Sequence, residues 1–503
     1  MNIQERLAQV VPVRLEPNLD GLSDGERRML PLLVEAARAM DDAFWVQSYG
    51  DREALLAQAG DAATRRYLRM CYGPWDRLRE DEAFVAGAGP RPTGANFYPA
   101  DMTEEEFAAA AAERPDLHSR YTMVRRDAQG RLVAIPYHRF FDEPCRRAAS
   151  KLRQAAALAE NPELQTFLSL RAEALLTDEY RSSDFAWMDM KANALDILIG
   201  PMETSADRLL WAKAAFASTL FAKDWAWSRR LARYVELLPR FQAHLPAPAA
   251  YKAEPPGLDS DLYVYDAIYC AGYDNSSIAL GINWPDDEEV RARKGTRSLQ
   301  VKNLMRAKFD TLLAPLVPLL VAADQAAHVT FDAFFLFIVF HELGHALGLK
   351  HTLDGRGLVR DALGGEDYVV EEAKADVLSL AMITQLHQWG ELSAGVLLDV
   401  YVTAQADIFR RGGRQAMARL NFFKEMGDCS RAAGTGTYRL LPEYMGPAIS
   451  APAERLLRLQ GDGDYAGARA FLERYAQPDT DVARDLARVN SAGLPLEIML
   501  EQD

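Results

Sequence analysis

Two histidines and a glutamate form a candidate metal-binding motif in the second half of the chain. The segment His341-Glu342-Leu343-Gly344-His345 has the pattern HExxH. On a helix, residues i and i+4 lie on one face, so both imidazoles can reach the same ion. Glu342 lies about 100° around such a helix from His341, where its carboxylate can reach a water beside the ion without binding the ion. The pattern predicts a zinc site with Glu342 as the catalytic base.

A catalytic zinc ion needs a third protein ligand and one open position. The segment 371–376, EEAKAD, is predicted to be helical and has Glu372 and Asp376 at i and i+4. Glu372 can complete a His2Glu site, and Asp376 can accept a hydrogen bond from a ligand imidazole. Two other interpretations stay open. The acidic residues can simply start a solvated helix, and His351 completes the pattern HExxHxxGxxH, in which it would be the third ligand.

The elements around the motif are mostly helical. Residues 331–340 are apolar nearly all round, which predicts a buried helix and a dry, rigid setting for the motif. Ser23 with Glu26, and Thr103 with Glu106, have the spacing of helix-capping boxes. Composition predicts further helices over 151–176, 206–238 and 379–408, a hairpin over 121–136, and strands over 195–200, 262–268 and 278–283. The first 290 residues are therefore expected to be mixed, and 296–430 helical.

Bulk composition excludes several classes of protein. The chain has 503 residues, 49% of them hydrophobic, and a formal net charge of −15. An acidic chain argues against nucleic acid as a partner, because phosphates need a basic surface. Four widely spaced cysteines without a CxxC pair argue against a disulfide framework. No apolar run is long enough to span a bilayer. We therefore expect a cytoplasmic protein without a membrane or nucleic-acid partner.

Several segments together resemble a known family. Besides HExxH and EEAKAD, they are 96–103 (NFYPADMT), 121–137, 199–204 (IGPMET), 294–297 (KGTR), 348–350 (GLK) and 459–465 (LQGDGDY). The chain resembles the dipeptidyl peptidase III family from about residue 90 onward, especially its shorter bacterial and plant members with a five-residue zinc motif. The breadth of this resemblance favours Glu372 over His351 as the third ligand.

The resemblance implies a fold and a cofactor. It implies a mainly α protein with a smaller mixed α/β part, built as two lobes with a central cleft, and one Zn2+ per chain. We expect a helical N-terminal region over 1–90, a mixed α/β lobe over 90–295, a helical zinc-binding lobe over 296–430, and a C-terminal region over 431–503 that packs on the lobes.

The resemblance also implies an activity. Members of the family cut dipeptides from the N-terminus of short peptides by metal-activated water. By resemblance, Glu203 and Asn283 bind the free amine of the substrate, and their oxygens suit an ammonium group. Asp286 stands where the family has a second asparagine. The expected partner is a short peptide or another small molecule.

Two positions depart from the family pattern. Ser205 replaces a tyrosine and Gly412 replaces a histidine, and both family residues support the transition state. Oxyanion donors are worth about 10²–10³ in rate each, so His351 or Arg414 would have to substitute. The alternative function is the same zinc scaffold used for a non-peptidase reaction, as a hydrolase, lyase or isomerase on a small metabolite. A peptide-binding relative without turnover is a third possibility.

Overall fold

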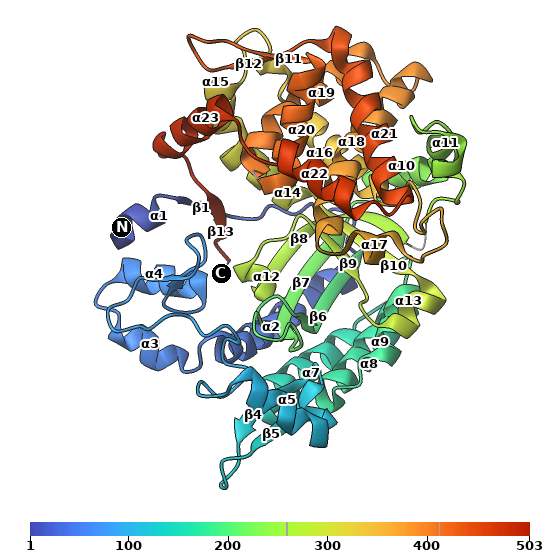
Figure 1. Cartoon of the computed structure of the whole chain (residues 1–503). Coiled ribbons are helices and arrows are strands. Elements are labelled where there is room, and N and C mark those ends of the chain that lie inside the picture. The colour runs from blue at the N-terminus through green and yellow to red at the C-terminus, as the bar shows by residue number, and fades with distance from the viewer. Residues whose placement is uncertain (258–259, 412, 503) are drawn as a thin grey trace. The chain divides into compact units, whose positions relative to one another are not determined.

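The computed structural model describes residues 1–257, 260–411 and 413–502 (Figure 1). Gly412, one of the two departures from the family pattern, lies outside the described residues. The chain forms two compact units. Unit 1 comprises Met1–Ser228, Asp259–Leu304 and Ile498–Asp503, and unit 2 comprises Arg229–Leu258 and Met305–Glu497. The mainly helical character and the smaller mixed α/β part expected from the sequence are confirmed.

Unit 1 is built on a five-stranded mixed sheet with strand order β6-β7-β8-β10-β9. Its strands are β6 (Leu195–Glu203), β7 (Ala215–Lys223), β8 (Ser260–Gly272), β9 (Gly281–Trp284) and β10 (Thr296–Val301). β10 runs parallel to β8, and the other neighbouring pairs are antiparallel. Glu203 pairs with Ala215 at the end of β6, and Asn283 pairs with Ser298. The sheet therefore fixes the backbone at both residues predicted to bind the substrate amine.

Helices and small hairpins surround this sheet in unit 1. Helix α2 begins with the predicted capping box of Ser23 and Glu26 and packs on β7 and β8. Thr103 caps α5 as predicted, and the predicted hairpin over 121–136 is confirmed as β4–β5. The elements are α1 (Ile3–Leu7), α2 (Asp24–Ser48), α3 (Arg52–Gln58), α4 (Ala62–Cys71), α5 (Glu104–Glu113), α6 (Tyr137–Phe140), α7 (Asp142–Ala156), α8 (Pro162–Thr177), α9 (Arg181–Asp189), α12 (Tyr273–Ser276), α13 (Glu288–Lys294), β1 (Val10–Val13), β2 (Trp75–Asp76), β3 (Glu82–Ala83), β4 (Thr122–Arg126) and β5 (Leu132–Pro136).

Unit 2 is helical, and its centre is the buried helix α16 (Phe331–Gly344). Thr330 caps its N-terminus, and side chains all around the helix are buried, as the apolar run predicted. α16 packs against α18 (Asp367–Gln388) and α19 (Ala394–Arg411), and α20 (Gly413–Met426) packs against both of these. The remaining elements are α11 (Leu238–Ala243), α15 (Val317–Leu320), α17 (Val359–Leu363), α21 (Met445–Gly461), α22 (Tyr465–Tyr475), α23 (Thr480–Ser491), β11 (Cys429–Arg431) and β12 (Tyr438–Leu440). α10 (Trp225–Glu236), α14 (Lys302–Lys308) and β13 (Glu497–Leu500) include residues of both units.

Three helix predictions are wrong in extent. The helix predicted over 151–176 is two helices, because Asn161 caps a new helix that starts at Pro162. The helix predicted over 206–238 is β7 followed by α10. β7 is buried along its whole length between β6 and β8, and this pairing overrides the helical propensity of its alanines. The helix predicted over 379–408 is interrupted at Gly390, whose φ is +78°.

Two further findings concern the cysteines and the search for helices that could span a membrane. All four cysteines have free thiols, and three of them are buried. Within the described part of the chain, no helix is both long enough and apolar enough to cross a membrane.

The HExxH helix and α18 touch backbone to backbone at Gly344. A Cβ atom added at Gly344 would lie 2.9 Å from the Ala375 carbonyl oxygen and 3.0 Å from the Ala375 Cα. Ala375 lies three residues after Glu372 on α18. The absence of a side chain at Gly344 therefore lets the two helices approach closely enough to bring Glu372 beside the histidines.

We predict that Gly344→Ala destabilises unit 2 and weakens metal binding. Backbone atoms cannot rotate away from the new methyl group, so the helices must separate, at a cost of about 1–3 kcal/mol. Thermal unfolding and zinc titration measure both effects. Gly446→Ala is the matched control, because Gly446 lies in α21 with nothing within 4 Å of an added Cβ; its melting temperature should not fall. Equal stability of the two variants would contradict the prediction.

Candidate metal centre

The structure brings His341, His345 and Glu372 together in unit 2. The Nε2 atom of His341 lies 3.5 Å from one Glu372 carboxylate oxygen, and the Nε2 atom of His345 lies 3.8 Å from the other. One ligand atom from each residue lies within 4.8 Å of the other two. Ligands about 2.0–2.1 Å from a tetrahedral zinc ion are separated by roughly 3.3 Å. The three residues therefore fit a metal ion with little adjustment.

Each imidazole is oriented by a carboxylate on α18. His341 Nδ1 lies 2.8 Å from Asp376 Oδ1, and His345 Nδ1 lies 2.8 Å from Glu371 Oε1. These hydrogen bonds place a proton on each Nδ1 and leave each Nε2 lone pair available to a metal. Asp376 therefore has the contact that the sequence predicted for it.

Glu371 is a functional residue that the sequence interpretation missed. Besides His345, its carboxylate is contacted by Gln460 Nε2 at 2.7 Å and by Lys374 Nζ at 2.8 Å. Burial alone would raise the pKa of Glu371, but Lys374 and the hydrogen bond with His345 outweigh it and hold the pKa well below its usual range. The doubled glutamate at the start of EEAKAD was the available signal, because a carboxylate is a common partner of a ligand imidazole and the segment offers one more carboxylate than the sequence interpretation used.

Glu342 is the candidate base, and its side chain is half-buried. Across residues 1–257, 260–411 and 413–502, no group forms a hydrogen bond or ion pair with its carboxylate, which sets it apart from Glu371, Glu372 and Asp376. It follows His341 directly on α16. Its lone pairs are thus available to a water molecule.

His351 is not part of this group. Its side chain is 63% exposed, and its Nδ1 atom lies 3.3 Å from Glu254 Oε1. Gly348, with φ +89°, turns the chain after the HExxH helix, and the His351 backbone then pairs with Leu358. The structure therefore brings Glu372, and not His351, to the two motif histidines.

The residues predicted to bind the substrate amine lie in unit 1. Glu203 Oε1 accepts hydrogen bonds from the Ser205 backbone N–H at 3.0 Å and from the Ser205 hydroxyl at 2.7 Å. Asn283 is exposed on β9. Arg120 links the segment that contains Glu203 to the segment that contains Asn283. It donates to Asp286 Oδ2 at 2.7 Å and to the Met202 carbonyl oxygen at 3.4 Å. The charge of Asp286 is therefore compensated by Arg120.

Asp274 is another acidic residue of this part of unit 1. Asp274, in the short helix α12, accepts a hydrogen bond from the Thr219 hydroxyl at 2.6 Å. Burial, with a contribution from the nearby charge of Glu203, raises the pKa of Asp274 to about 6.

Arg414 was considered as a substitute oxyanion donor. It lies in unit 2 and forms an ion pair with Glu366 at 3.2 Å.

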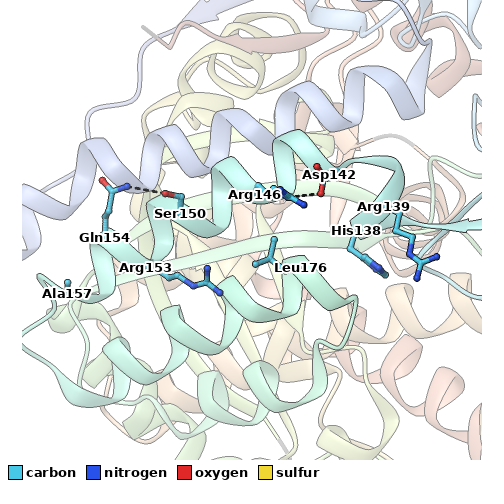
Figure 2. Close-up of a pocket in the computed structure, with 9 residues that line it drawn as sticks. All are labelled: His138, Arg139, Asp142, Arg146, Ser150, Arg153, Gln154, Ala157 and Leu176. Atoms are coloured by element: carbon cyan, nitrogen blue, oxygen red, sulfur yellow. Dashed lines mark hydrogen bonds and ion pairs between the residues drawn. The ribbon is translucent and has the colours of Figure 1, made fainter.

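A separate groove of about 860 Å³ runs along α7 in unit 1. Figure 2 shows its lining side chains projecting mainly from α6 and α7, with Leu176 from α8. Two of its three arginines form ion pairs: Arg146 is 2.7 Å from Asp142, and Arg153 is 2.9 Å from Glu173. Among the described residues, the groove holds no group of three side chains placed to bind a metal ion.

Comparison with known proteins defines the family. Residues 102–387 match the family described as peptidase family M49. The structure of DPP III from Caldithrix abyssi is 33% identical and has a TM-score of 0.95, with 99% of this chain and 98% of that chain covered. Dipeptidyl-peptidase III from Corallococcus sp. strain EGB is 30% identical with a TM-score of 0.82, and 99% and 96% of the two chains are covered. The chain belongs to peptidase family M49, the dipeptidyl peptidase III family, as the sequence motifs predicted.

One relative carries a different name. Nudix hydrolase 3 from Arabidopsis thaliana is 28% identical, and the match covers 99% of this chain and 73% of that protein. The relatives of this chain therefore carry different names, so its activity is inferred from its own site.

We predict that Glu372→Gln lowers zinc affinity and that His351→Gln does not, which would distinguish the two candidates for the third ligand. Loss of Glu372 removes the carboxylate that faces both Nε2 atoms, so zinc affinity should fall by at least about 100-fold. His351→Gln should leave zinc affinity within about twofold, because His351 lies outside the group. Zinc titration of the metal-free variants against a chelator measures both. A large loss of affinity in the His351 variant would overturn the assignment.

Proposed function

We propose that the protein is a zinc-dependent hydrolase that cleaves peptide bonds near the N-terminus of short peptides. The observation that carries the proposal is the convergence of His341, His345 and Glu372 beside Glu342. Membership of peptidase family M49 supports the same reaction. Three protein ligands leave the fourth tetrahedral position for water or substrate, as catalytic zinc sites require.

The residues of this centre have separate roles in the proposed reaction. When bound, zinc lowers the pKa of a water molecule and polarises the scissile carbonyl. Glu342 accepts the proton of the attacking water and delivers it to the nitrogen of the leaving amine as the C–N bond breaks. Asp376 and Glu371 keep the two imidazoles in the tautomer and orientation that the centre needs.

Selection for a free N-terminus is assigned to unit 1. Glu203 offers a carboxylate whose orientation is held by Ser205, and Asn283 offers an exposed amide oxygen. A carboxylate–ammonium hydrogen bond is charge-assisted and is stronger than a neutral one. Asp274 adds a second acidic group near Glu203. The substrate class is therefore a short peptide with an unmodified amine. Free thiols fit a reducing compartment, so we also propose a cytoplasmic location.

The second candidate is the same zinc scaffold acting on a small metabolite in a non-peptidase reaction. The observation that favours it is the contact of Ser205, which stands where the family has a tyrosine. The Ser205 hydroxyl donates to Glu203, so it is committed to that carboxylate instead of a developing oxyanion. Loss of such a donor costs about 10²–10³ in rate.

We predict that Glu342→Gln abolishes turnover while zinc stays bound. The amide cannot accept the proton of water, and general base catalysis contributes about 10²–10⁴ in rate. Metal analysis and a cleavage assay on the same preparation measure both quantities. Glu443→Gln, at an exposed glutamate of unit 2, is the control and should keep full activity. An active Glu342 variant would remove this residue from the mechanism.

We predict that acetylation of the substrate N-terminus blocks cleavage. A peptide library of about three to ten residues, with free and acetylated N-termini, should show release of dipeptides from the free set alone, because acetylation removes the charge that Glu203 would bind. Mass spectrometry identifies the products. Equal cleavage of both sets would refute the amine site, and no cleavage of either by the zinc-loaded protein would favour the metabolite reaction.

A further inference from the structure

The carboxylate that orients His341 is itself held by a buried arginine. Asp376 Oδ1 contacts His341 Nδ1 at 2.8 Å, and Asp376 Oδ2 lies 3.2 Å from Arg419 Nη1. The side chain of Asp376 is 0% exposed and that of Arg419 is 1% exposed. The imidazole, the carboxylate and the guanidinium thus form one buried chain that starts at a candidate metal ligand.

Arg419 is fixed by contacts from two other helices. Its Nη2 atom donates to the Ala404 carbonyl oxygen of α19 at 2.7 Å. Its guanidinium lies 5.0 Å from the centre of the Phe337 ring, and Phe337 precedes His341 by four residues on α16. Arg419 comes from α20, which lies with α16, α18 and α19 in unit 2 (Figure 1). The guanidinium is therefore held in place without help from Asp376.

A buried carboxylate is costly unless a positive charge and hydrogen bonds compensate it. His341 must stay neutral to bind a metal, so its Nδ1–H gives Asp376 one hydrogen bond but no compensating charge. Lys374 does not fill this role, because its ammonium contacts Glu371 and the Leu347 carbonyl oxygen. Arg419 supplies a compensating positive charge, because its Nη1 atom forms an ion pair with Asp376 Oδ2 at 3.2 Å.

We propose that Arg419 is a positioning residue of the metal centre: through Asp376 it sets the orientation of His341 and thereby the affinity for the metal. The inference rests on the proposed zinc centre, and it adds a residue far from HExxH and EEAKAD in the sequence. It predicts that the charge of Arg419 matters to zinc binding only while Asp376 is present.

The test measures zinc affinity of the full-length metal-free protein by competition with a chelator. Arg419→Gln removes the charge but keeps a hydrogen-bond donor, and we expect about 10- to 100-fold weaker zinc binding, the range for such outer partners. Arg419→Lys keeps the charge and should recover part of the loss. Zinc affinity of a folded Arg419→Gln protein equal to that of the wild type would overturn the proposal.

Arg171→Gln is the matched control. Arg171 is equally buried in unit 1, forms an ion pair with buried Asp184 and donates to the Ile199 carbonyl oxygen at 3.1 Å. This variant should lower the melting temperature of the metal-free protein, as Arg419→Gln does, but leave zinc affinity within about twofold, because Arg171 has no link to a ligand. Similar losses of zinc affinity in both variants would show a general effect of stability and would contradict the proposal.

A double mutant keeps the test decisive if Arg419→Gln alone does not fold. The variant Asp376→Asn/Arg419→Gln removes both charges of the pair, which is better tolerated than removing one. Its zinc affinity should equal that of Asp376→Asn within about twofold, since Arg419 acts through Asp376. A further tenfold loss would overturn the proposal. Absence of zinc binding by the wild-type protein would instead refute the zinc centre, and this inference with it.

Discussion

The metal centre depends on one constraint: the imidazoles of His341 and His345 must present Nε2 to the same point. A histidine can do this only if its Nδ1–H has an acceptor, and inside a protein that acceptor must be supplied. Helix α18 supplies both acceptors, Asp376 for His341 and Glu371 for His345, and it also carries Glu372. The geometry of the centre is therefore set by how closely α16 and α18 approach, and the bare backbone at Gly344 allows that approach.

The region predicted to bind the amine is characterised by its acidic residues and by how their charges are compensated. Asp286 forms an ion pair with Arg120, whereas Glu203 accepts hydrogen bonds from the neutral groups of Ser205. Burial raises the pKa of Asp274, and the charge of Glu203 adds a smaller contribution, so negative charge is poorly solvated in this part of unit 1. A cation is the ligand that would relieve this situation, which agrees with an ammonium group.

The sequence allowed some features to be predicted because they depend on short-range patterns. The spacing of HExxH and of Glu372 with Asp376 has meaning only on helices, and both helices formed. The apolar run over 331–340 likewise matched a buried helix. β7 was missed because its alanines favour a helix locally, while the pairing with β6 and β8 that decides its structure comes from residues far away in the chain. Arg419 was missed for a similar reason, since no spacing relates it to His341, whereas the doubled glutamate of EEAKAD was a signal for Glu371 that the interpretation did not use.

Charge balance links these residues to a divalent ion. Within the centre, Glu342, Glu371, Glu372 and Asp376 bring four carboxylates, and Lys374 and Arg419 bring two cations. The two cations contact Glu371 and Asp376, the partners of the histidines. Glu372 and Glu342 are the two carboxylates assigned to bind the metal and to take a proton from water. A dication would balance them, whereas a monovalent ion would leave a net negative charge in a half-buried site, which is unfavourable. The arrangement therefore selects for a divalent metal through its charge as well as through its donor atoms.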